Sequence, residues 1–132
     1  MDESTRPARQ FLVLGSILAG IGVAAGAFGA HGLKEFLSPD MLATYETAVR
    51  YQMYHSLALI ATGLYVHRSD GAQPKLASGA AWFFVAGILL FSGSLYALTL
   101  TGFRWLGLVT PLGGIAFLIG WGMLAMAAWK RS

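Results

Sequence analysis

Five polar side chains lie at or within the long apolar stretches of the sequence. One is a histidine that ends the first stretch, and four lie in the first half of the second: His31, Glu46, Arg50, Gln52 and His55. Polar and ionisable groups at membrane depth are the usual place for a function, and histidine can ligate a metal or move a proton. A structural role is nevertheless the favoured interpretation. Glu46 and Arg50 have the i,i+4 spacing of a helical ion pair, and Gln52 and His55 can bond to neighbouring helices.

The same sequence argues against several kinds of chemistry. In the predicted topology His31 lies at a membrane surface and His55 about 9–10 Å deeper by the helical rise, which does not suit a bis-histidine haem site. None of the 6 Asp and Glu residues lies in a predicted membrane core, there is no cysteine, and no nucleophile–base pair lies at depth. The sequence therefore predicts no catalytic residue, no metal site and no cofactor, and an enzyme is the least favoured class.

The composition indicates a membrane protein. Of the 132 residues, 56% are hydrophobic and only 11% are charged, whereas soluble domains carry about 25% charged residues. The net charge is +3, and the basic residues sit at the ends of apolar segments, which favours anionic lipid headgroups over nucleic acid as their partners. The first apolar run, Phe11 to Ala30, is too long for the core of a signal peptide and is predicted to be a retained span.

The positions of polar and apolar residues predict an all-α integral membrane protein with four transmembrane helices in one compact bundle. The second span belongs to a longer helix that enters from a polar outer segment, because Ser38-Pro39-Asp40 is a typical helix start. A kink or break is expected near Pro111 in the last span. The whole chain 1–132 is one domain, with spans at about 11–30, 47–66, 76–100 and 105–129 and short tails at 1–10 and 130–132.

The basic residues predict the orientation. Four spans place both termini and the middle connection on one side of the membrane. That side carries six basic residues, and the other side three, which are Lys34, Arg50 and Arg104. Because cytoplasmic connections are enriched in Lys and Arg, both termini are predicted to be cytoplasmic.

Small residues predict where helices pack closely. Gly22, Gly26 and Ala30 form a small-xxx-small row on the first span, and Ala116 and Gly120 offer a second such face on the last. Such rows let helix backbones approach each other in lipid. Gly29 and Gly32 belong to the same glycine-rich string as Gly26, where close packing or a left-handed helix end at Gly32 explains the glycines better than a phosphate loop does.

Two motifs carry a family resemblance. The strings Gly-Ala-Phe-Gly-Ala-His-Gly-Leu at 26–33 and Tyr-Glu-Thr-Ala-Val-Arg-Tyr-Gln-Met-Tyr-His at 45–55 resemble the family of small membrane proteins called domain of unknown function 423, which is similar to eukaryotic transmembrane protein 256. The resemblance covers nearly the whole chain. It implies a multi-pass protein of the bacterial inner membrane, and it implies no reaction.

Three functions are compatible with these features. The favoured one is a non-enzymatic structural or accessory protein that binds lipid or a partner membrane complex, either as one copy or as a homo-oligomer. The first alternative is a binding site for quinone, haem or a hydrophobic metabolite near His31, Gln52 and His55. The second is a small oligomeric transporter or channel with Gln52, His55 and Thr62 lining a pore.

Overall fold

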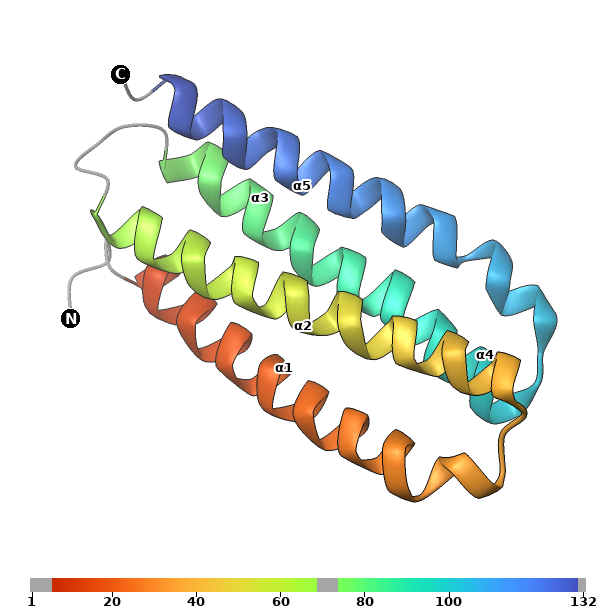
Figure 1. The fold of residues 1–132 in the computed structure, drawn as a ribbon. Coiled ribbons are helices and arrows are strands. Elements are labelled where there is room, and N and C mark those ends of the chain that lie inside the picture. The colour runs from red at the N-terminus through yellow and green to blue at the C-terminus, as the bar shows by residue number, and fades with distance from the viewer. Residues whose placement is uncertain (1–5, 69–73, 131–132) are drawn as a thin grey trace.

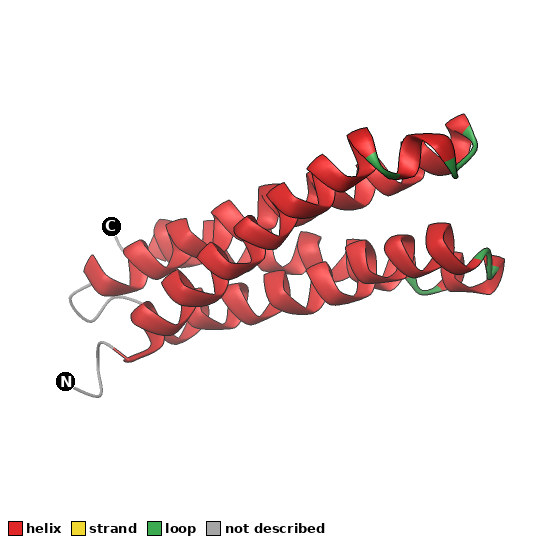
Figure 2. Ribbon diagram, turned by 90° about the horizontal axis from the view of Figure 1, so that it is seen from below, coloured by secondary structure: helices red, strands yellow, loops and turns green. Residues whose placement is uncertain are grey.

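The computed structural model describes residues 6–68 and 74–130, and nearly all of them are helical. Helix α1 (Arg6–His31) is followed by α2 (Pro39–Arg68). A third rod consists of α3 (Pro74–Gly87), a π-helical segment η3 (Ile88–Ser92) and α4 (Gly93–Thr101), and the last rod is α5 (Thr110–Lys130). Figure 1 shows the rods lying side by side, with α1 and α2 joined at the end opposite both termini. After the 90° turn of Figure 2 they still run close to parallel, as in a bundle.

Three of the helical rods have the length and apolar composition of a membrane span: Arg6–His31, Pro74–Thr101 and Arg104–Lys130. Helix α2 is longer than any of these, with 30 residues, but it carries more polar side chains. It packs against α1 and against all three parts of the third rod, α3, η3 and α4. The membrane-protein class thus follows from three rods, and α2 packs against two of them while one of its faces stays exposed.

The helix boundaries follow from local residue chemistry. The predicted start of the second helix is confirmed, because α2 begins at Pro39 and Ser38 Oγ accepts the backbone N–H of Met41 at 3.2 Å. The predicted break near Pro111 is also confirmed, since a 3₁₀ turn, η4 (Arg104–Leu108), precedes α5 and Pro111 lies in the first turn of α5. Proline is tolerated there because its missing N–H has no helical partner to lose.

The N-terminal boundary lies earlier in the chain than the sequence indicated. Residues 6–10, assigned to the tail 1–10, form the first turns of α1, and Ala8 is buried against Val66. Positions 1–5 of that tail and 131–132 of the tail 130–132 lie outside the described residues. The polar segment after His31 contains a single 3₁₀ turn, η2 (Leu33–Glu35), and no longer surface helix.

Helices α1 and α2 pack through a repeat of seven residues. Small buried residues on α1 recur at this interval: Ala8, Gly15, Gly22 and Gly29. Larger buried residues recur at the same interval on α2: Tyr45, Gln52, Leu59 and Val66. A Cβ on Gly29 would lie 2.6 Å from the Tyr45 ring, and a Cβ on Gly15 only 2.8 Å from the carbonyl oxygen of Ser56. Glycine is therefore needed there for the close approach that holds membrane helices together.

Helices α3 and α5 pack in the same way, except that the second helix of this pair carries the small residues. On α5 the small buried residues Gly113, Gly120 and Ala127 recur every seven residues. A Cβ on Gly120 would lie 2.8 Å from the ring of Phe84 on α3. The apolar centre of the bundle lies between the two helix pairs and consists of buried side chains from all four rods, among them Phe11, Leu59, Phe84, Ile88 and Phe117.

The predicted packing rows occupy different environments in the bundle. Gly22 is buried and Gly26 is half-buried opposite Val49, whereas Ala30 is exposed. Ala116 and Gly120 are both buried. The expectation of a left-handed helix end at Gly32 is wrong, since its φ is −89°. Among the described residues, the left-handed glycine is Gly102, with φ 78°, which ends α4 before the tight connection to η4.

Candidate functional site

Gln52 links three helices. Its amide Nε2 donates to the carbonyl oxygen of Leu18 on α1 at 2.8 Å, and its Oε1 accepts the hydroxyl of Tyr96 on α4 at 2.6 Å. The residue is 3% exposed. A glutamine facing lipid would be unfavourable, but this one is paired at both ends of its amide. Its position on the α2 repeat therefore serves to join α1 and α4 to α2.

Further buried hydroxyl groups lie near Gln52, toward the end of the bundle where α1 joins α2. Tyr45 packs edge-on against Tyr96 and donates to the carbonyl of Ala25 at 2.7 Å. Ser92, in the π-helical segment, donates to the carbonyl of Ala48 at 2.7 Å. Within the described ranges, no buried side-chain nitrogen or oxygen lacks a hydrogen-bond partner. We call Tyr45, Gln52, Ser92 and Tyr96 the polar layer.

His55 is held on both of its nitrogens and on one face. Nδ1 lies 2.7 Å from the carbonyl oxygen of Tyr51, and Nε2 accepts the indole N–H of Trp121 at 3.0 Å. Because a carbonyl only accepts, the neutral ring must carry its proton on Nδ1. The ring stacks on Phe117 with the centroids 3.5 Å apart. Ligation of a metal or haem iron by Nε2 would require Trp121 to leave.

The other candidate residues lie apart from this centre. His31, at the end of α1, is exposed, as are Glu46 and Arg50 on α2. The Arg50 guanidinium donates to Thr47 Oγ1 at 3.2 Å, and no ion pair joins it to Glu46 in the described part of the chain. The bundle thus brings Gln52 and His55 into its interior and leaves His31, Glu46 and Arg50 on its surface.

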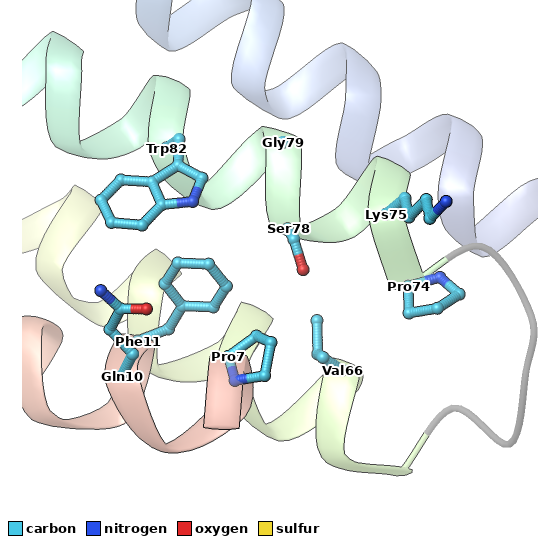
Figure 3. Close-up of a pocket in the computed structure, with 9 residues that line it drawn as sticks. All are labelled: Pro7, Gln10, Phe11, Val66, Pro74, Lys75, Ser78, Gly79 and Trp82. Atoms are coloured by element: carbon cyan, nitrogen blue, oxygen red, sulfur yellow. The ribbon is translucent and has the colours of Figure 1, made fainter. Parts of the chain in front are cut away.

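A groove of about 620 Å³ lies at the opposite end of the bundle, between the first turns of α1 and α3. Buried Phe11 and Val66 form its floor. Pro7 and Gln10 line it from α1, and Pro74, Lys75, Ser78, Gly79 and Trp82 line it from α3. Figure 3 shows the Ser78 hydroxyl pointing into the space between Pro7 and Val66. We call this space the α1–α3 groove.

The α1–α3 groove has an apolar inner end and a charged mouth. At the inner end Trp82 contacts Phe11 edge-on, with the ring centroids 5.5 Å apart. Past Trp82 a shallow apolar depression continues along α3 over Gly79, Phe83 and Ala86. The mouth belongs to what we call the basic end, whose described charged residues are all cationic: Arg6, Arg9, Arg68, Lys75 and Lys130.

Sequence reasoning did not find this groove. Pro7 and Gln10 had been assigned to a tail, and nothing in the spacing of Lys75, Ser78 and Trp82 distinguishes them from the start of any span. The prolines that open two segments next to basic residues were the available signal, since proline favours the first turn of a helix. These prolines indicate two helix starts at one membrane surface. They do not indicate that the two starts lie next to each other.

Comparison with known proteins gives a family and no activity. Residues 25–114 match the family described as protein of unknown function (DUF423). The chain is 46% identical over 120 residues to a UPF0382 membrane protein of Staphylococcus aureus (strain bovine RF122 / ET3-1), covering 91% of this chain and 95% of that protein. It is 44% identical to the UPF0382 membrane protein YwdK of Bacillus subtilis, covering 91% and 96%. No solved structure is significantly similar.

Proposed function

This chain belongs to the DUF423 family of membrane proteins, and on that premise we propose that it is a non-enzymatic accessory protein that holds lipid in its α1–α3 groove. The observation that carries the proposal is the position of the groove. It opens between two helix starts at the basic end, where apolar bundle surface gives way to cations. A cleft with an apolar floor at that level faces the region where lipid headgroups meet acyl chains.

The proposal includes a four-span topology in the bacterial inner membrane, with both termini in the cytoplasm. Helix α2, at 30 residues, is about 45 Å long, which is enough to cross a bilayer. Its buried polar side chains bond to backbone carbonyls or to the side chains of Tyr96 and Trp121, which makes a polar span tolerable in lipid. Exposed Trp105, in η4, and Trp129, near the end of α5, lie at opposite ends of the candidate span Arg104–Lys130 and suit the two interfaces.

Labelling of single cysteines tests this topology, because the natural sequence has no cysteine. We expect Lys34→Cys to react with a membrane-impermeant maleimide in intact spheroplasts, and Arg6→Cys and Lys130→Cys to react only after the membrane is opened. A three-span protein, in which α2 does not cross, would place residues 6 and 130 on opposite sides. Labelling of either residue in intact spheroplasts would overturn the proposed orientation.

The alternatives have less support from the geometry. A quinone, haem or metabolite near His31, Gln52 and His55 would need polar atoms that are free to bind it. Gln52 and the His55 nitrogens already have partners, and His31 is on the surface. A pore lined by Gln52, His55 and Thr62 would need these side chains to face outward in an oligomer, but all three are buried within one chain.

Filling the groove tests lipid holding directly. We expect Ser78→Phe to place a ring in the space between Pro7 and Val66, and so to remove the lipid that remains on wild-type protein after mild detergent extraction. Native mass spectrometry counts that lipid. The matched control is Ala125→Phe, an equally bulky change at an exposed position of α5 near the same end of the bundle. Wild-type protein without bound lipid, or equal lipid on both variants, would contradict the proposal.

A further inference from the structure

We propose that the α1–α3 groove selects an anionic phospholipid of the cytoplasmic leaflet, with the phosphate at Lys75 and one acyl chain passing Trp82 along α3. This inference rests on the proposed function and names the class of lipid. It joins three observations that are independent of one another: the charge at the mouth, the depth of the groove and the apolar surface beyond it.

The charged residues described at the mouth are all cationic. Lys75 lines the groove, is exposed, and forms no ion pair with any described residue. A second shallow hollow, lined by Arg6 and Arg9, shares Gln10 with the groove. In the full sequence, the segments 1–9, 67–75 and 130–132 carry six basic and three acidic residues. The segment 31–50 and the 101–105 connection together carry three basic residues and three acidic ones, Glu35, Asp40 and Glu46. A phosphate group with net negative charge is therefore favoured at the basic end, and a zwitterionic headgroup gains less.

The depth of the groove matches the upper part of a phospholipid. Lys75 and Trp82 are seven residues apart on one helix, which corresponds to about 10 Å along its axis. The headgroup zone of a bilayer occupies roughly the outer 5–7 Å of each leaflet. Lys75 thus lies at the level of phosphate when Trp82 lies at the first carbons of the acyl chains. Between them Ser78 offers a hydroxyl at the level of the glycerol esters.

The apolar surface beyond the groove suits one acyl chain. The depression over Gly79, Phe83 and Ala86 shares Trp82 and Gly79 with the groove, so the two form one continuous path down α3. The path is lined by the rings of Trp82 and Phe83 and by the small residues Gly79 and Ala86. A chain that leaves the groove past Trp82 would lie in the path, while the second chain remains in the bilayer.

Competition between two lipids in one sample tests the inference. Delipidated wild-type protein in detergent is mixed with equal amounts of phosphatidylglycerol and phosphatidylcholine that have the same acyl chains, and native mass spectrometry gives the ratio bound. We expect phosphatidylglycerol to be favoured about fivefold, the effect of one basic residue near a lipid phosphate. Lys75→Gln should bring the ratio to about one without loss of total lipid, and Lys75→Arg should keep the preference.

Lys130→Gln is the matched control, since it removes one positive charge from the same end outside the groove. Loss of the preference in both glutamine variants would show general surface attraction and overturn the inference. Equal binding of the two lipids by wild-type protein would also overturn it, but would leave lipid holding in place. If neither lipid binds, both proposals fail.

Discussion

Gly113→Ala is expected to lower the free energy of unfolding by about 3 kcal/mol, toward the upper end of what overpacking does. A Cβ at this position would fall on the backbone nitrogen and Cα of Phe91, in the π-helical segment. A backbone cannot rotate away as a side chain can, so α5 must separate from the third rod. The expected result is a large drop in the midpoint of thermal unfolding in detergent, followed by circular dichroism.

Gly122→Ala on the same helix is the control for Gly113→Ala. No atom lies within 4 Å of a Cβ placed there, and alanine is the better helix former by about 1 kcal/mol. This control should therefore leave stability unchanged or raise it slightly. Similar midpoints for the two variants would show that the α5 contact with Phe91 is not tight.

His55→Leu is expected to destabilise the protein by about 2 kcal/mol. The change removes the bond to Trp121, a kind of interaction that contributes about 0.6 and up to roughly 1.7 kcal/mol between membrane helices. It also removes a stacked aromatic pair with Phe117, which adds about 0.5–1.5 kcal/mol. Unfolding in detergent measures the loss. A ligand-binding histidine would instead give unchanged stability together with a lost adduct in the mass spectrum.

Trp121→Phe completes a double-mutant cycle for this pair. It keeps an aromatic ring against Phe84, and it removes the indole N–H that Nε2 of His55 accepts together with one ring of the indole. If the hydrogen bond is the main link, the double variant should be more stable by about 1 kcal/mol than the sum of the single changes predicts. Additive losses would mean that His55 and Trp121 stabilise the bundle separately.

The sequence was most informative where a single segment decides the outcome. Twenty apolar residues before His31, a serine–proline start at Ser38 and a proline at 111 each act through their own helix, and the structure has a helix, a cap and a break at these places. The packing row was harder to predict. Counting every fourth residue selected Gly22, Gly26 and Ala30, whereas the buried row repeats every seventh and extends back to Ala8.

Pairings between distant segments could not be predicted in the same way. The partner of His55 is Trp121, 66 residues away, and the partners of Gln52 come from two different helices. The α1–α3 groove likewise exists only because two helix starts are placed together by the packing of α2 between them. Residue type identified polar side chains that need partners, but only the arrangement of the helices identifies those partners.

The two antiparallel helix pairs also give the chain an order of assembly. Because synthesis begins at the N-terminus, α1 and α2 can pair first, and Gln52 then has the Leu18 carbonyl within reach. Oε1 of Gln52 and Nε2 of His55 gain their partners, Tyr96 and Trp121, only when the second helix pair is in place. A chain that stops after its first pair therefore leaves Oε1 of Gln52 and Nε2 of His55 unpaired. Those unpaired groups distinguish an incomplete copy from a finished one.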